Sequence, residues 1–223
     1  MIVEKFETIT LINGDCMEYM CKQPDNSFDL AIVDPPYGIG EDGTKNHTRG
    51  NLAKGKKYKP YCNGNQKPSK EYFNELFRVS KNQIIWGANH FIENCAKNST
   101  AWIIWDKQNG ETDFADCELA YSSFKIAARK FTFRWAGMLQ GNMKNKEIRI
   151  HPNQKPVALY EWILRYYSKH GDKILDTHAG SMSSCIACHN GNYEMTAIEI
   201  DIDYYIAGKQ RLLNHQAQQR LFV

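Results

Sequence analysis

Asp34, Pro35, Pro36 and Tyr37 form the segment of this sequence with the clearest chemical potential. They directly follow the apolar run 30–33, which is typical of a buried parallel strand. Open α/β sheets bind ligands at the carboxyl ends of such strands. Because a proline has no amide hydrogen, the carbonyl oxygen of Pro35 can stay free beside the Asp34 carboxylate. Two neighbouring acceptors of this kind could hold both hydrogens of an NH2 group.

Such a pair of acceptors suits the exocyclic amino group of adenine or cytosine. That nitrogen is a poor nucleophile because its lone pair is delocalised into the ring. Holding its hydrogens draws it toward a tetrahedral geometry, from which it can attack a methyl group placed in line. Tyr37 offers a flat ring for a base to stack on, an interaction worth about 1 to 3 kcal/mol. The base must be flipped out of a duplex first. A proline turn that only ends a strand is the alternative interpretation.

A second segment has the pattern of a nucleotide-binding half-domain. The apolar residues 173–175 predict a strand, which leads through the small-residue turn 176–181 into a helix at 183–190. The next predicted strand, 195–198, ends at Glu199. A tight turn at Gly180 lets a ligand approach the backbone near a helix N-terminus, and an acid about 20 residues further on can hold the two hydroxyls of a ribose.

The remaining pattern indicates which elements position these residues. Strands are predicted at 8–12, 30–33, 83–86, 101–105, 173–175 and 195–198, and helices at 70–79, 156–169, 183–190 and 203–219. Strands that alternate with helices predict an α/β fold with a mostly parallel sheet and helices on both faces. The length of 223 residues favours one domain over the whole chain.

The order of these motifs resembles the permuted, beta-order DNA amino-methyltransferases, in which the catalytic motif precedes the cofactor motif. The resemblance extends over nearly the whole chain. It includes Gly14-Asp15-Cys16 before the catalytic strand, residues 102–107 on a middle strand and the segment 151–156, which reads His-Pro-Asn-Gln-Lys-Pro. It implies a single Rossmann-like methyltransferase domain, S-adenosylmethionine as the cofactor, and double-stranded DNA as the substrate. Restriction-modification is the biological setting that it suggests.

By this resemblance Asp34, Pro35, Pro36 and Tyr37 are the catalytic residues. The candidate cofactor-binding residues are Asp15, Cys16, Lys155, Pro156, Asp176, His178, Gly180, Ser181, Glu199 and Asp201. The chain departs from the family pattern at His178 and Met182, where a Phe and a second Gly are usual.

Two basic segments are predicted to contact DNA. Residues 41–70 hold eight basic and two acidic residues, a local charge of +6, although the whole chain carries only +3. A solvated lysine-rich loop without a partner is the alternative. The second segment is the insertion 131–152. The candidate DNA-contacting residues are Lys54, Lys56, Lys57, Arg134 and Trp135.

Several classes of protein and site are not expected. No apolar run approaches the roughly 20 residues of a membrane-spanning helix, and the N-terminus lacks the pattern of a signal peptide, so a cytoplasmic protein is expected. The seven cysteines are expected to be free thiols. Cys185 and Cys188 precede a histidine in a haem-attachment pattern, but packing inside a helix is favoured. No metal site is expected, because the histidines and cysteines lack ligand spacing.

Three hypotheses follow for the function. The first is methylation of adenine N6 in DNA, because an Asp at the head of the catalytic tetrad is typical of the adenine enzymes. The second is methylation of cytosine N4, where a Ser is commoner. The third is a DNA-binding module of the same fold without turnover, motivated by the altered turn at His178 and Met182. A separate target-recognition domain does not fit in this length, so a short recognition sequence or a homodimer is expected.

Overall fold

The computed structural model describes residues 1–39, 66–95, 98–110, 115–136 and 139–220. Within them, nine strands form one sheet in the order β1-β2-β11-β10-β3-β4-β6-β5-β7. Five parallel neighbours make up its centre: β2 (Ile9–Asn13), β11 (Glu194–Glu199), β10 (Lys173–Asp176), β3 (Phe28–Val33) and β4 (Ser80–Trp86). The sheet is therefore mostly parallel, as expected.

The strands added at the two edges of the central sheet differ in direction. β1 (Ile2–Phe6) pairs antiparallel with β2 at one edge. Beyond β4, the strand β6 (Cys117–Ser122) runs antiparallel, and β5 (Ile103–Asp106) and β7 (Arg129–Thr132) then return to the direction of the centre. A separate two-stranded ribbon, β8 (Trp135–Ala136) with β9 (Leu139–Gln140), lies in the insertion 131–152.

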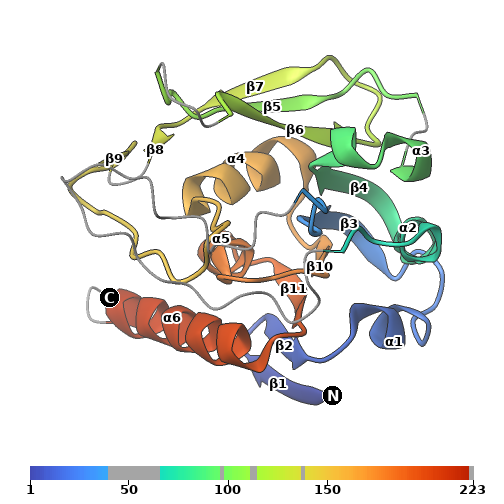
Figure 1. The fold of residues 1–223 in the computed structure, drawn as a ribbon. Helices are drawn as coiled ribbons and strands as arrows, with labels where there is room; N and C mark the ends of the chain where they lie inside the picture. The colour runs from blue at the N-terminus through green and yellow to red at the C-terminus, as the bar shows by residue number, and fades with distance from the viewer. Residues whose placement is uncertain (40–65, 96–97, 111–114, 137–138, 221–223) are drawn as a thin grey trace.

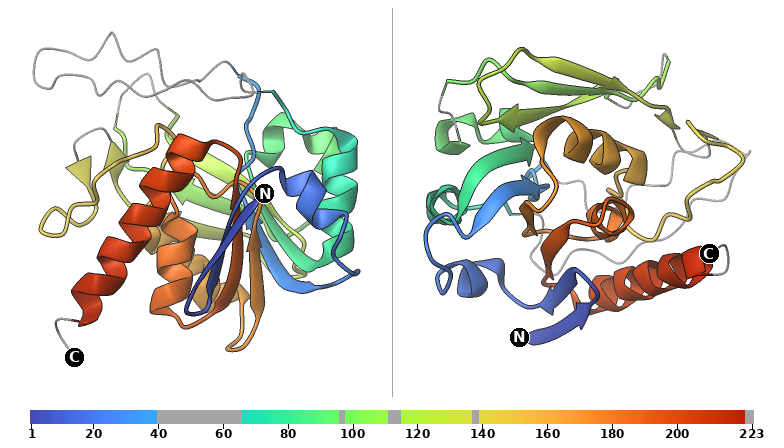
Figure 2. Two further views of the ribbon diagram at one scale, coloured as in Figure 1. Left: turned by 90° about the horizontal axis from the view of Figure 1, so that it is seen from below. Right: turned by 180° about the vertical axis from the view of Figure 1, so that it is seen from behind.

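Helices cover both faces of the sheet. In Figures 1 and 2 the sheet curves around α4 (Val157–Tyr167) and α5 (Ser183–Asn190), with α6 (Ile202–Arg220) beside them. The other face carries α1 (Cys16–Met20), α2 (Lys70–Val79), the 3-10 turn η2 (Ala88–His90) and α3 (Ile92–Cys95). This arrangement confirms the Rossmann-like α/β fold with its permuted motif order.

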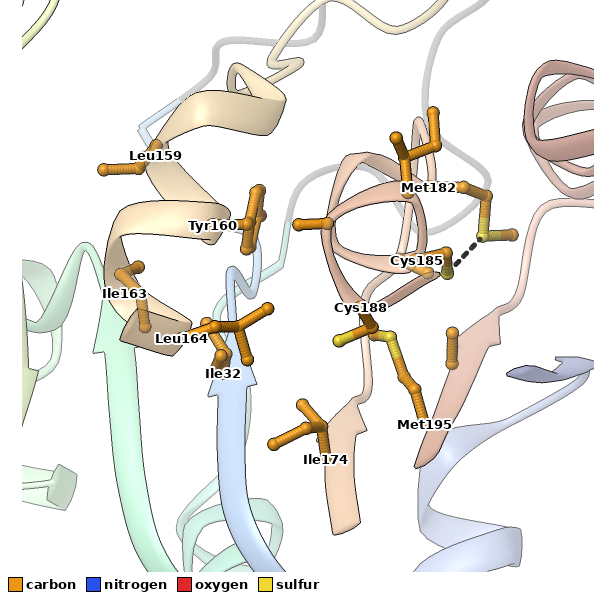
Figure 3. Close-up of a cluster of buried hydrophobic side chains, with 14 of the residues drawn as sticks. Ile32, Leu159, Tyr160, Ile163, Leu164, Ile174, Met182, Cys185, Cys188 and Met195 are labelled. Atoms are coloured by element: carbon orange, nitrogen blue, oxygen red, sulfur yellow. Dashed lines mark hydrogen bonds between the residues drawn. The ribbon is translucent and has the colours of Figure 1, made fainter. Parts of the chain in front are cut away.

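The last four residues of the strand β3, 30–33, are apolar because they are buried on both faces of the sheet. Successive side chains of a strand point to opposite faces. Leu30 and Ile32 belong to the core under α4 and α5, whereas Ala31 and Val33 belong to the core under α2. Figure 3 shows Ile32 among side chains of α4 and α5. Such two-sided burial fixes the end of β3, and with it the position of Asp34.

The cysteines of α5 pack as the sequence predicted. Cys185 and Cys188 are at most 1% exposed and lie in the core between α5 and the sheet (Figure 3). The Cys185 Sγ is 3.6 Å from the Met182 Sδ. Burial raises the pKa of both thiols, which keeps them protonated and unreactive.

The predicted elements agree with the structure in the centre of the sheet and less well beyond it. The helices expected at 70–79 and 183–190 have those bounds, and all six predicted strands are present. Strands β1, β6 and β7 and helix α1 were not predicted. No helix in the described part of the chain is long and apolar enough to cross a membrane.

Candidate active site

The parallel sheet brings the two motifs of the sequence together. β3 pairs directly with β10, with Ile174 opposite Leu30 and Leu175 opposite Ala31. The strands run in the same direction, so Asp34 and the turn after Asp176 both lie at the carboxyl edge. Residues 176–182 are named the glycine turn below. Ligands of open α/β sheets bind at this edge.

Asp34 already has a hydrogen-bond donor on each carboxylate oxygen. The Tyr37 hydroxyl donates to Asp34 Oδ1 at 2.7 Å, and the Lys155 ammonium donates to Asp34 Oδ2 at 2.5 Å. Lys155 also lies 3.2 Å from the Tyr37 hydroxyl oxygen. By resemblance Lys155 was expected at the cofactor. The structure places its ammonium group on the carboxylate of the predicted catalytic residue.

A second carboxylate, Glu118, contacts the same lysine from β6, which is separated from β3 by β4. Its Oε2 is 2.9 Å from Lys155 Nζ, and its Oε1 is ion-paired with Lys107. Glu118 is the second residue of the antiparallel strand β6, opposite Trp105 of β5. Because β6 runs backward, its first residues lie at the carboxyl edge of its neighbours. Asp34, Tyr37, Lys107, Glu118 and Lys155 are named the charged cluster below.

Burial and charge set the ionisation of this cluster. Burial raises the pKa of Glu118, but Lys155 and Lys107 outweigh burial and bring it down to about 2. Burial, together with the Glu118 charge, raises the pKa of Asp34 despite its contact with Lys155. Burial lowers the pKa of Lys155, and the two carboxylates more than compensate, so that it rises. Two carboxylates therefore share one buried ammonium, and Lys107 balances the remaining charge.

Tyr37 is held by residues that the sequence did not single out. A Cβ at Gly87 would lie 2.0 Å from Tyr37 Cε1, so the Tyr37 ring fits only against a glycine. The His90 ring stacks on Tyr37 with centroids 5.0 Å apart and an interplanar angle of 16°. His90 therefore occupies one face of the Tyr37 ring.

Asp176 is held by neutral donors of the glycine turn and α5. Its Oδ1 accepts the His178 backbone N–H at 3.0 Å, and its Oδ2 accepts the Ser184 hydroxyl at 2.7 Å. Burial raises the pKa of Asp176 to about 6, and these hydrogen bonds only partly oppose it. The His178 ring contacts Thr177 through Nδ1, and burial lowers its pKa to about 4, so the ring is neutral at neutral pH.

Glu199 lies at the same site, at the end of β11. Its Oε2 accepts the Gly180 N–H and its Oε1 accepts the Asp201 N–H, both at 2.8 Å. Burial raises the pKa of Glu199 to about 7, against the effect of these two donors. The carboxylate is thus fixed at the strand end where an acid was expected to hold a ribose.

The glycine turn keeps its backbone shape although Met182 replaces the usual second glycine. Met182 has a φ of 59°, in the left-handed region that glycine adopts most easily. Its side chain is fully buried against α6, where a Cβ at Gly208 would lie 2.5 Å from Met182 Cγ. The absence of a side chain at Gly208 therefore makes room for Met182.

Asp15 lies beside Glu199 because β2 and β11 are parallel neighbours. Asn13 pairs with Glu199, and the Gly14 N–H donates to the Glu199 carbonyl oxygen at 3.2 Å. Asp15 is the N-cap of α1, its Oδ1 accepting the Met17 N–H at 2.8 Å, and it remains exposed. Cys16 starts that helix, and burial raises the pKa of its thiol to about 12.

These residues suit S-adenosylmethionine. Two carboxylates, Asp15 and Glu199, lie at the ends of neighbouring strands, and carboxylates accept hydrogen bonds from an adenine amino group and from ribose hydroxyls. The Glu199 carboxylate is oriented by backbone donors, and Gly180 lets a ligand approach the turn. This arrangement of hydrogen-bond acceptors therefore fits the adenosine part of the cofactor.

The other predicted cofactor residues have structural partners. Pro156 is the N-cap of α4, and Ser181 is buried with its hydroxyl 3.0 Å from that of Ser183. Asp201 accepts the Asp203 N–H at 2.9 Å at the start of α6. Their roles toward the cofactor stay predictions.

The predicted DNA-contacting residues have different surroundings. Lys54, Lys56 and Lys57 lie outside the described residues. Arg134 is exposed, but the next residue, Trp135, is 8% exposed, and its indole N–H donates to the Gln154 carbonyl oxygen at 2.8 Å. Arg149 lies over its ring at 4.5 Å. The Trp135 side chain thus belongs to the core and has little exposed surface, and its contact with DNA stays a prediction.

The residues that the structure describes contain no group of three histidine, cysteine, aspartate or glutamate side chains that could hold a metal ion. The charged cluster instead balances its carboxylates with lysines.

Comparison with known proteins agrees with this arrangement. A family model described as DNA methylase matches residues 28–210. The type II methyltransferase M2.MboI of Moraxella bovis is 28% identical over 92% of this chain and 88% of its own length. The DNA adenine methyltransferase YhdJ of Escherichia coli is 24% identical over 92% of this chain and 83% of its own length.

Two solved structures have the same fold. The complex of M1.HpyAVI with S-adenosylmethionine superposes with a TM-score of 0.56 at 21% identity, covering 91% of this chain and 99% of that one. The cytosine-N4-specific PvuII DNA methyltransferase has a TM-score of 0.60 at 11% identity, covering 96% and 95%. With the tetrad Asp34 to Tyr37 ahead of its glycine turn, this chain belongs to the N6/N4 DNA methylase family, whose cofactor is S-adenosylmethionine.

Proposed function

We propose that the protein methylates the N6 amino group of a flipped-out adenine in double-stranded DNA. The observation that carries this proposal is Asp34 at the head of the catalytic tetrad, beside the glycine turn. An Asp at this position is typical of adenine enzymes in the family. The E. coli relative named as a DNA adenine methyltransferase, similar over 92% of this chain, supports the same target.

The charged cluster would act on the target amino group. The Asp34 carboxylate and the Pro35 carbonyl oxygen accept its hydrogens, which localises the nitrogen lone pair for attack. S-adenosylmethionine supplies an electrophilic methyl group. Pro36 keeps this strand end rigid, and the Tyr37 hydroxyl orients the carboxylate from 2.7 Å.

The glycine turn and its neighbours would hold the cofactor. Asp15 and Glu199 accept hydrogens from the adenine and the ribose, and Gly180 allows close approach to the backbone. The remaining members of the predicted cofactor site are Cys16, Lys155, Pro156, Asp176, His178, Ser181 and Asp201. Of these, Lys155 is the one whose ammonium group contacts the catalytic carboxylate directly.

DNA would be held by basic side chains around this edge of the sheet. The predicted contacts are Lys54, Lys56, Lys57 and Arg134, and the binding surface could be enlarged by a homodimer. Each lysine that contacts a phosphate adds to the salt dependence of binding. Replacing all three lysines by Met should therefore weaken DNA affinity and flatten its salt dependence.

The direct test is transfer of a labelled methyl group from S-adenosylmethionine to unmethylated duplex DNA, followed by mass analysis of the nucleosides. N6-methyladenine from the wild type, and none from Asp34→Ala, is the expected result. N4-methylcytosine would overturn the adenine assignment. Cofactor binding without any methyl transfer would favour a module that has lost turnover.

A further inference from the structure

Each oxygen of the Asp34 carboxylate already accepts a hydrogen bond, and the positive charge of Lys155 weakens the carboxylate as an acceptor for a further amino group. Tyr37 occupies one oxygen at 2.7 Å and Lys155 occupies the other at 2.5 Å. A base amino group and a lysine ammonium are both N–H donors, so they compete for the same acceptor. Binding of the base at Asp34 Oδ2 is therefore strengthened when Lys155 moves away from that oxygen.

Lys155 is largely shielded from water that could replace this contact. Its side chain is only 4% exposed. A buried ammonium left without any anionic partner is strongly destabilised. Another anion must therefore receive Lys155 if Asp34 is to be freed.

Glu118 is placed to receive it. Its Oε2 is already 2.9 Å from the Lys155 Nζ, on β6, across the sheet edge from β3. The side chains of Asp34 and Glu118 are 15% and 21% exposed, so both are mostly shielded from solvent. Lys107 pairs with the other oxygen of Glu118 and so keeps it ionised. A small movement of the ammonium toward Glu118 then keeps the charge balanced.

Resting on the proposed role of Asp34, we propose that Glu118 is a positioning residue that holds the Lys155 ammonium when the amino group of the target base replaces it on Asp34. Lys155 thereby occupies Asp34 Oδ2 until a base binds. Lys107 supports Glu118 from the opposite side.

The test measures whether Glu118 acts through Lys155. Glu118→Gln has nearly the same shape but no charge, so Lys155 should stay on Asp34 and oppose the base. We expect a single-turnover methylation rate about 100-fold below wild type, with cofactor affinity unchanged. Glu118→Asp, which keeps the charge, should recover part of the rate. Asp106→Asn removes a neighbouring carboxylate paired with the exposed Lys130 and should retain the wild-type rate.

The decisive comparison repeats Glu118→Gln in the Lys155→Met background. Without the competing ammonium, the substitution should change the rate by less than about twofold. Equal losses in both backgrounds, or a wild-type rate for Glu118→Gln alone, would overturn the proposal.

The proposed function and this inference can fail separately. Both adenine and cytosine present an exocyclic amino group, so the rates are measured on whichever base the wild type methylates. A cytosine product would overturn the adenine assignment, and a loss at Glu118→Gln that depends on Lys155 would still support the positioning role.

Discussion

The charged cluster and the glycine turn lie at the same edge of the sheet, but they stabilise their carboxylates differently. In the charged cluster, Asp34 and Glu118 are balanced by the lysines Lys107 and Lys155. In the glycine turn and the adjoining strand end, Asp176 and Glu199 accept hydrogen bonds from backbone N–H groups and a hydroxyl. Neutral donors do not outweigh burial, so the pKa values there rise to about 6 and about 7.

The difference indicates a division of labour. A carboxylate paired with lysines contacts groups that a base amino group can replace. A carboxylate held by backbone donors is fixed in place and suits the recognition of hydroxyl groups. Changes in the charged cluster should therefore affect methyl transfer, whereas changes around the glycine turn should affect cofactor affinity.

Gly87→Ala should have a larger effect than Gly208→Ala. The added Cβ would lie 2.0 Å from the Tyr37 ring and displace it from Asp34. A misplacement of about 1 Å can cost about 100-fold in rate, so the methylation rate should fall by that order while cofactor affinity stays unchanged. Gly110→Ala is the matched control, because Gly110 has the same φ of 66° and nothing within 4 Å of the added atom. Equal losses of rate in both variants would show that backbone strain alone is responsible.

A smaller effect is expected from the pH dependence of cofactor binding. The pKa of Glu199 is about 7, raised from its ordinary value of 4.5. Hydroxyl donors prefer the carboxylate, so affinity for S-adenosylmethionine should rise about tenfold from about pH 6 to about pH 8. Calorimetry over this range measures it, and Glu199→Gln should bind more weakly with a flatter profile. An unchanged pH profile in Glu199→Gln would assign the dependence to another group.

The raised pKa of Glu199 also makes the free energy of unfolding depend on pH. Because the folded-state pKa of Glu199 is raised, the folded protein binds this proton more tightly than the unfolded chain does. The stabilisation is complete below the unfolded pKa and is lost as the pH rises through about 7. In Glu199→Gln the free energy of unfolding should therefore fall less over this interval.

The smallest effect is expected from Gly208→Ala. The new methyl group would lie 2.5 Å from Met182 Cγ and 3.1 Å from the Gly180 carbonyl oxygen. Overpacking costs about 1 to 3 kcal/mol, and the helix gains about 1 kcal/mol from replacing a glycine, so the net loss of stability should be about 1 kcal/mol. With Met182→Gly the collision with the side chain is gone, and the same substitution should become neutral or stabilising. Thermal unfolding of the wild type, the two single variants and the double variant tests this coupling.

The glycine turn could be predicted from sequence because its parts are consecutive. The strand, turn, helix α5 and strand β11 follow one another, and Glu199 contacts Gly180 only 19 residues away. The core pattern of β3 likewise predicted where Asp34 would lie. Local periodicity and turn residues were sufficient in both cases.

The charged cluster could be predicted only in part because its contacts are distant in sequence. Lys155 meets Asp34 across 121 residues, and Glu118 reaches Lys155 through the reversed direction of β6. The segment 117–122 mixes exposed and buried residues without a clear alternation, so its strand was missed. Trp135 was considered for DNA contact because of its basic neighbours, but Arg134 is exposed whereas Trp135, the first residue of β8, is buried in the core.

The most direct test of this division of labour measures cofactor affinity and single-turnover methyl transfer in Asp34→Ala and Glu199→Gln. Asp34→Ala should bind S-adenosylmethionine as the wild type does and lose about 1,000-fold in methyl transfer at saturating cofactor. Glu199→Gln should bind the cofactor more weakly and recover most of its rate when the cofactor is saturating. Loss of cofactor binding in Asp34→Ala, or an equally slow Glu199→Gln at saturation, would contradict the separation of the two regions.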